Sequence, residues 1–249
     1  MPLIKNKDGE FGYYSHIPKC AGSSLVDALI YNGWFVHLNA MKQAGERKDF
    51  TPAIKMHLRD YNGLSESSHF KELPSTFHPC SHQHWHLKIV KHYCDLSHCR
   101  WKFAIVRDPV EKLISEFRFR KGAYCPLNST KTWDDYDLGR NKNKVQTTNF
   151  SYWLRMSHET SILNPYIWDN HFRPQCEFVE PGFDIIPFNL DKINFYLQDR
   201  LGFKSKIPWV NKSEFDEVNA TQEDRQFIEE WYNKDYELFE NKKDYNWIE

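Results

Sequence analysis

A segment of small and hydroxyl-bearing residues, HIPKCAGSS at 16–24, has the composition of an anion-binding turn. It follows an aromatic, β-branched stretch and precedes LVDALIYNGW, an order that predicts a strand, a turn and a helix. Backbone N–H groups can converge there, and the helix N-terminus and a lysine add positive potential. The candidate anion-binding residues are Lys19, Cys20, Ala21, Gly22, Ser23 and Ser24. A Walker A loop needs lysine after its glycines, whereas this lysine precedes the glycine, which disfavours an ordinary ATPase.

A second turn of this kind follows the apolar run WKFAIV at 101–106, which has the length of a buried strand. Arg107 at the strand end can bind a phosphate with two parallel hydrogen bonds, and Ser115, two helical turns further on, can donate another. The alternative for this pair is an ion pair of Arg107 with Asp108 or Glu111 and a solvent-facing serine. Two anion sites at two strand ends favour a ligand with two separated anionic groups.

Histidine and cysteine are concentrated at 78–99, where HPCSHQHWHLKIVKHYCDLSHC holds six of the twelve histidines and three of the six cysteines. This density suggests zinc, but no CxxC occurs and the spacing fits neither a zinc finger nor HExxH. We therefore predict no metal and keep a His/Cys metal-binding or redox module as an alternative. Six cysteines are too few for a disulfide scaffold in this length, so we expect thiols.

Strands and helices alternate along the chain. The predicted strands are 13–17, 34–38, 101–106 and 183–188, with a less certain one at 53–58; the predicted helices are 25–33, 109–121, 147–157, 190–201 and 221–239. We interpret 122–146 as a surface loop. This order predicts an α/β fold, with a parallel central sheet, right-handed crossovers and helices on both faces. Ligands of such sheets bind at the carboxyl ends of strands, where both turns lie.

Composition and charge narrow the classes further. Hydrophobic residues at 40% and aromatic residues at 16% supply a core and exclude wholesale disorder. We expect a single domain over residues 1–249. The net charge is -1, but the first 211 residues carry 28 basic against 22 acidic side chains, which suits a small anionic ligand better than a nucleic-acid polymer. No apolar run reaches the roughly 20 residues of a membrane span.

The two turns resemble the donor-binding motifs of sulfotransferases. HIPKCAGSS is similar to the 5'-phosphosulfate loop, and VRDPVEKLISEF to the 3'-phosphate motif, whose arginine and serine lie eight residues apart. The resemblance is closest to the branch that modifies carbohydrates, which includes the heparan sulfate 2-O- and 6-O-sulfotransferases and their bacterial relatives. DNHFRPQCEF at 169–178, NKS at 211–213 and YNKDYELF at 232–239 also resemble that branch. The resemblance implies a P-loop-like sulfotransferase fold.

The resemblance also implies the chemistry. The donor would be 3'-phosphoadenosine 5'-phosphosulfate (PAPS), the product PAP, and the acceptor a hydroxyl of a saccharide or another compound. Sulfuryl transfer is an in-line displacement in which charge moves to the bridging oxygen, so positioned cations should do most of the catalysis, as in phosphoryl transfer. Lys19 is the candidate for that oxygen, and Lys212 and Ser213 are expected to close over the 3'-phosphate.

The acceptor hydroxyl must lose a proton, and a histidine that titrates near neutrality is the expected base. In the relatives the base lies between the two phosphate motifs, which matches SHQHWH at 81–86. This favours His84, with His86 and then His82 as alternatives. The residues implied at the acceptor site are His86, His171, Arg173 and Gln175; the last three could instead brace the core.

Two interpretations compete with a PAPS-dependent O-sulfotransferase. A P-loop kinase would need a Walker A sequence and carboxylates for magnesium, and neither is evident. A His/Cys metal-binding module would rest on residues 78–99. The start, MPLIKNKDGE, lacks the apolar run of a signal peptide, so we expect a cytoplasmic enzyme; a Golgi-lumenal catalytic domain without its anchor, as in the family's animal members, is the alternative.

Overall fold

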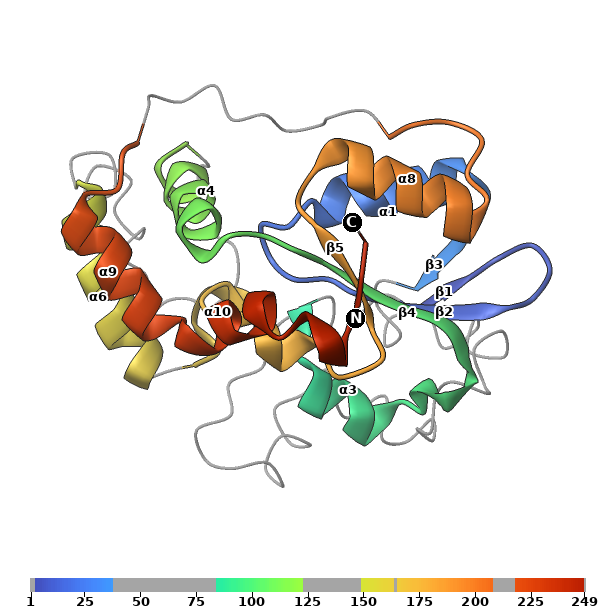
Figure 1. The fold of residues 1–249 in the computed structure, drawn as a ribbon, viewed down its shortest axis with the longest axis horizontal. Helices are drawn as coiled ribbons and strands as arrows, with labels where there is room; N and C mark the ends of the chain where they lie inside the picture. The colour runs from blue at the N-terminus through green and yellow to red at the C-terminus, as the bar shows by residue number, and fades with distance from the viewer. Residues whose placement is uncertain (1–2, 38–83, 123–148, 164, 208–217, 249) are drawn as a thin grey trace, which may run out of the picture.

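A mixed sheet forms the centre of the protein, and its six strands in the described part of the chain follow the order β3-β1-β2-β4-β5-β6 (Figure 1). Figure 1 shows the computed structural model, which describes residues 3–37, 84–122, 149–163, 165–207 and 218–248. The strands are β1 (Leu3–Lys5), β2 (Phe11–Ser15), β3 (Phe35–His37), β4 (Cys99–Val106), β5 (Asp184–Pro187) and β6 (Asn246–Trp247).

The pairing of the strands confirms the predicted α/β class and corrects one detail of it. β2, β4, β5 and β6 are parallel, but β1 pairs antiparallel with both β2 and β3. A tight turn, in which the backbone N–H of Asn6 donates to the carbonyl of Glu10, joins β1 to β2, and so short a connection allows only antiparallel pairing. The strand β1 was not predicted, because its three residues are too few for a periodic pattern.

Helices cover both faces of the sheet. α1 (Gly22–Tyr31) and α8 (Leu190–Leu201) lie on one face, and α3 (Leu87–Tyr93) and α10 (Asn233–Glu240) on the other (Figure 1). A separate group of helices, α4 (Pro109–Gly122), α6 (Phe150–Leu163) and α9 (Gln222–Trp231), stands beside the sheet (Figure 1). The short elements are α7 (Ile167–Asn170), η4 (Leu96–His98), η5 (Gln175–Phe178) and η6 (Lys242–Asp244).

The predicted helices around the sheet are confirmed, with one exception. α8 ends at Gly202, whose φ of 69° suits glycine, as the sequence predicts. The helix predicted over 221–239 is wrong as a single element: α9 and α10 are separate and meet at Tyr232. Tyr232 is fully buried and its hydroxyl donates to the carbonyl of Phe172 at 2.7 Å, which ties the chain to the core there. The predictions for 53–58 and for the loop at 122–146 fall almost wholly outside the described residues.

Two hydrophobic clusters hold these layers together. The larger one is built on the sheet, where Tyr13, Phe103 and Ile185 are fully buried with residues of α1, α3 and α8. The smaller one joins α4, α6 and α9, with Trp153 and Ile228 at 0% exposure. The segments that carry the side chains described below are anchored in these two clusters, so close packing fixes their positions. Among the described residues, no helix is both long and apolar enough for a membrane crossing.

Candidate functional site

The turn after β2 is shaped by two residues in the left-handed region, Lys19 at φ 67° and Ala21 at φ 60°. Such a turn brings successive backbone N–H groups onto one concave side. α1 begins at Gly22 and no side chain caps it with a hydrogen bond, so this helix start has the geometry of an anion-binding site. The alternative for a segment of this composition is a side-chain-capped helix start with an exposed lysine; here no side chain caps α1, and Lys19 is half-buried.

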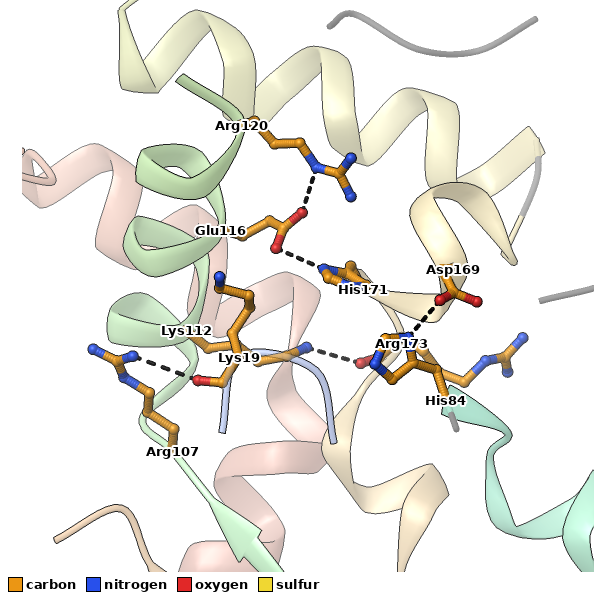
Figure 2. Close-up of polar contacts among 9 residues, drawn as sticks. All are labelled: Lys19, His84, Arg107, Lys112, Glu116, Arg120, Asp169, His171 and Arg173. Atoms are coloured by element: carbon orange, nitrogen blue, oxygen red, sulfur yellow. Dashed lines mark hydrogen bonds and ion pairs between the residues drawn. The ribbon is translucent and has the colours of Figure 1, made fainter. Parts of the chain in front are cut away.

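The side chain of Lys19 extends from this turn toward α4 (Figure 2). Its Nζ lies 4.0 Å from the centre of the Phe119 ring, so the aromatic face holds the ammonium in place. Burial lowers the pKa of Lys19, and the nearby carboxylate of Glu116 opposes that shift. The lysine is therefore half-buried and positioned at the site rather than extended into solvent.

Gly22 makes room for a histidine that the sequence analysis did not assign to the site. A Cβ at Gly22 would lie 1.7 Å from Nε2 of His16, which no real contact allows. His16 follows β2 directly, is buried, and stacks on Tyr14 with 5.7 Å between ring centres. Burial lowers its pKa well below the ordinary value, so the ring is neutral. Glycine at position 22 thus serves the packing of His16 as well as the turn.

The second turn adjoins the first because β2 and β4 are parallel neighbours. Nη1 of Arg107 donates to the carbonyl of Lys19 at 3.5 Å, which links the two turns (Figure 2). The guanidinium also lies 4.4 Å from the Phe188 ring and 3.5 Å from Oε2 of Glu111. Glu111 is half-exposed, so this ion pair is weak and an incoming anion can replace it. Ser115 lies half-buried on α4.

The side chain of Gln175 fixes the backbone of Arg107 with two hydrogen bonds. Its side-chain amide accepts from the Arg107 N–H at 2.9 Å and donates to the Arg107 carbonyl at 2.6 Å. The carboxylate of Asp235 in turn accepts from the Gln175 N–H at 2.9 Å, and the Cys20 thiol approaches Gln175 Oε1 at 3.5 Å. Gln175 has no exposed surface, so these contacts favour the bracing role that the sequence analysis gave as an alternative.

Three histidine rings meet beside Lys19. His84 contacts His16 and His171 edge-on, with 4.8 Å and 5.0 Å between ring centres. Nδ1 of His84 lies 2.6 Å from Oδ2 of Asp169, and Nδ1 of His171 lies 2.7 Å from Oε2 of Glu116 (Figure 2). We call these five residues the histidine cluster. It therefore contains two histidine–carboxylate pairs that face each other.

The His171–Glu116 pair is fully enclosed. Nε of Arg120 donates to the other oxygen of Glu116 at 2.7 Å, and both side chains are buried. Burial alone would raise the pKa of Glu116, but His171 and Arg120 lower it below the ordinary value. Burial lowers the pKa of His171 to about 4 although Glu116 opposes the shift. This pair thus holds an ionised carboxylate against a neutral imidazole at pH 7.

The His84–Asp169 pair depends on unusual backbone. Trp168, Asp169 and Asn170 have φ values of 49°, 61° and 64°, so α7 is a left-handed turn and not a regular helix. Each non-glycine residue in this region costs about 1–3 kcal/mol and persists only where its surroundings hold it. Such strain is often found at functional sites.

His86 and Arg173 lie at the edge of this group. Burial lowers the pKa of His86 to about 3, and the charges of Arg173 and Lys88 add to the effect. Arg173 is buried and already engaged: Nε donates to Oδ1 of Asn170 at 3.0 Å and Nη1 pairs with Glu177. Its carbonyl accepts from the buried Nζ of Lys112 at 3.0 Å (Figure 2). Arg173 thus braces the left-handed turn.

Comparison with protein families assigns this architecture. The model described as "Sulfotransferase family" matches residues 12–188, more than half of the chain, and the match includes both turns and the histidine cluster. The chain belongs to the sulfotransferase family. The comparisons with curated proteins and with solved structures gave no match. The family establishes a transferase that moves a sulfuryl group and has the α/β fold described above.

The structure brings together most of the sequence-predicted site residues of this sulfotransferase. Lys19 to Ser24, Arg107 and Ser115 lie at two neighbouring strand ends, and His84 and His171 meet beside Lys19. Lys212, Ser213 and the alternative base His82 lie outside the described residues. The sequence analysis missed His16, Glu116, Arg120 and Asp169. A signal existed for two of them, because Lys112, Glu116 and Arg120 recur every four residues on the helix face that also carries apolar side chains.

A possible cation site lies within the cluster and not in the segment 78–99. His84, Asp169 and His171 each offer one ligand atom within 4.8 Å of the others. Two of the three groups, His84 and Asp169, already bond each other, so we assign no metal to the three, and the absence of a metal stays a prediction. The described cysteines form no disulfide, which confirms the thiol prediction for them: Cys20, Cys94 and Cys99 are buried and Cys176 is half-buried. Burial raises the pKa of Cys20 and of Cys99 to about 12, so both are protonated.

Proposed function

We propose that this sulfotransferase transfers the sulfuryl group of PAPS to a hydroxyl of a saccharide acceptor, with His84 as the general base. The family match supports sulfuryl transfer, and the donor, acceptor and base are inferred from the residues of the site. The observation that carries the proposal is the placement of the histidine cluster beside Lys19, whose turn adjoins the turn of Arg107 on the neighbouring strand (Figure 2).

The donor fits the two turns by its charges. Residues 19–24 offer the uncapped start of α1, the hydroxyls of Ser23 and Ser24, and Lys19 for the 5'-phosphosulfate. Arg107 and Ser115 would bind the 3'-phosphate, and Lys212 and Ser213 remain proposed partners of the same group. Because Arg107 contacts the Lys19 carbonyl, binding at one turn orders the other.

The reaction requires one proton acceptor and one stabilised leaving oxygen. As the acceptor oxygen forms its bond to sulfur, its proton passes to His84, and the bond between sulfur and the bridging oxygen breaks. The electron pair of that bond stays on the 5'-phosphate oxygen, where Lys19 stabilises the charge. Phe119 holds the lysine ammonium before the reaction starts, so little reorganisation is needed.

A saccharide acceptor is inferred from the segments that resemble the carbohydrate-modifying branch. His86 and the neutral His171 are the proposed contacts of the acceptor at the cluster. Arg173 and Gln175 support the same site indirectly, through Asn170 and through Arg107.

The proposal predicts that PAP binds and stabilises the protein, and a thermal unfolding series with increasing PAP measures this. A ligand at about 100 times its dissociation constant adds roughly 2.7 kcal/mol to the free energy of unfolding. Adenosine 5'-monophosphate, which lacks the 3'-phosphate, is the matched control and should stabilise less. A screen of saccharides with labelled PAPS then tests transfer. No stabilisation by PAP at millimolar concentration would contradict the proposed donor.

A further inference from the structure

The left-handed turn at residues 168–170 requires an explanation, because three consecutive non-glycine residues adopt a conformation that is usually found one residue at a time. Asparagine and aspartate tolerate it better than other residues, since their short side chains can bond locally. Trp168 has no such advantage, so its conformation must be imposed by packing.

Packing around Trp168 supplies this constraint. The indole is buried, stacks on Trp153 at 6.0 Å between ring centres and contacts Phe172 at 4.8 Å. The guanidinium of Arg120 lies 4.5 Å from its ring. Trp168 is thus anchored in the cluster of α4, α6 and α9, which holds the two residues that follow it.

The turn directs two side chains to one histidine. Oδ2 of Asp169 lies 2.6 Å from Nδ1 of His84, and Nδ2 of Asn170 donates to the carbonyl of His84 at 2.9 Å. Arg173 fixes Asn170 in turn, through its Nε at 3.0 Å from Oδ1. Both the ring and the backbone of His84 are therefore held by residues more than eighty positions away in the sequence. If the turn served only to hold the chain in place, the contact with the backbone of His84 would be sufficient.

We propose that Asp169 is a positioning residue for His84: its carboxylate accepts the Nδ1–H, which leaves the lone pair of Nε2 directed at the acceptor hydroxyl. A neutral imidazole has one N–H and one bare nitrogen, and the partner of one nitrogen decides which is which. After His84 takes the proton, the same carboxylate stabilises the imidazolium. This role rests on the proposed function of His84 as the base.

Of the described groups around His84, the carboxylate of Asp169 is the one placed to determine the tautomer of the ring. The two rings packed edge-on against His84, those of His16 and His171, are kept neutral by burial. The other carboxylate of the cluster, Glu116, bonds His171 and Arg120. Among these neighbours, Asp169 is the carboxylate that bonds the His84 ring directly, with Oδ2 at 2.6 Å from Nδ1.

The experiment combines two Asp169 variants with nuclear magnetic resonance of ¹⁵N-histidine-labelled protein. Asp169→Gly removes the carboxylate and also relieves the backbone strain, so it should fold at least as well as wild type. Asp169→Asn keeps the shape and the left-handed tolerance but loses the charge. Asp8→Asn, in the exposed turn between β1 and β2, is the control for removing an aspartate elsewhere. Comparison with the spectrum of His84→Gln identifies the signals of the two His84 ring nitrogens.

We expect wild-type His84 to be protonated at Nδ1 and bare at Nε2, and Asp169→Gly to move the proton to Nε2. We also expect kcat to fall at least about tenfold in both variants. This loss should be smaller than the ~10²–10⁴-fold effect of removing the general base itself. KM for the donor and the affinity for PAP should change less than about twofold. An unchanged tautomer, or an unchanged kcat, in folded Asp169→Gly would overturn the proposal.

The tautomer is measured without substrate, so it separates this inference from the proposed function. If wild type neither binds PAP nor transfers sulfate, the proposed function fails whatever the spectra show. If wild type does both and the Asp169 variants are as active as Asp8→Asn, only the positioning role fails.

Discussion

The two anion turns and the histidine cluster differ in how the chain builds them. Each turn is a continuous stretch, 19–24 or 107–115, in which backbone groups and one cation are placed by the end of a strand and the start of a helix. The cluster collects His16, His84, Glu116, Asp169 and His171 from four separate segments, and their apolar chain neighbours belong to both hydrophobic clusters. Under the proposed function, local geometry would thus provide donor binding, and long-range packing would provide the groups for the chemistry.

This difference predicts that donor affinity and turnover can be lost separately, and His84→Ala should show the largest effect. Removing the base should lower kcat by ~10²–10⁴-fold, while PAP affinity stays close to wild type, because the described ring contacts of His84 are with His16, His171 and Asp169. Steady-state kinetics and calorimetry with PAP measure the two quantities. His86→Ala is the control and should lose less activity. A folded His84→Ala enzyme with more than about a tenth of wild-type kcat would move the role to His86 or His82.

Gly22→Ala tests a place where the first turn and the histidine cluster are in contact. The added Cβ would overlap the ring of His16, so the ring or the turn must move, and overpacking of this kind typically costs about 1–3 kcal/mol. We expect reduced thermal stability together with losses in both PAP affinity and kcat.

The double variant Gly22→Ala with His16→Ala is the matched control for this prediction, because it restores the missing space. It should recover most of the lost stability and PAP affinity, whereas His16→Ala alone should retain PAP binding. If the double variant is no better than Gly22→Ala alone, the effect comes from the turn itself and the coupling through His16 is wrong.

The same division explains what the sequence could predict. The turns could be predicted because a strand, a turn and a helix start are consecutive in the chain, so the local pattern alone places residues 16–24 and Arg107 at strand ends. α8 and its end at Gly202 were predicted for the same reason. Asp169 could not be found in this way, because its role depends on contact with His84, 85 positions away, and on strain imposed by Trp168.

Two errors in the fold have similar physical causes. The break between α9 and α10 follows from the buried hydroxyl of Tyr232, a tertiary contact that overrides a continuous helical pattern. The antiparallel strand β1 depends on pairing with β2 and β3, since its own three residues carry little signal. His16 was visible in the sequence but was interpreted as a strand residue, although β2 ends at Ser15.

Arg107→Ala tests the turns alone and should give an intermediate effect. A hydrogen bond to a charged group contributes roughly 1.5–3 kcal/mol, so PAP affinity should fall about 10- to 150-fold. Gln175 bonds the backbone of residue 107 and not its side chain, so the fold should persist. Arg100→Ala, at the exposed start of β4, is the matched control and should leave PAP binding unchanged. Calorimetric titration with PAP decides, and equal affinities for the two variants would remove Arg107 from the donor site.

The smallest expected effect is on the pH dependence of stability, and it comes from a buried histidine rather than from the turns. The pKa of His86 is lowered to about 3 by burial, whereas an unfolded histidine titrates near 6.5. Between these values the unfolded chain binds a proton that the folded protein excludes, so stability falls as pH decreases. For one such group the free energy of unfolding decreases by at most about 2 kcal/mol from pH 7 to pH 5.

Urea unfolding at both pH values should therefore show a smaller loss of stability in His86→Gln than in wild type. His98→Gln, which alters an exposed histidine, should match wild type. Equal losses in wild type and His86→Gln would mean that His86 is already charged or solvated in the folded protein.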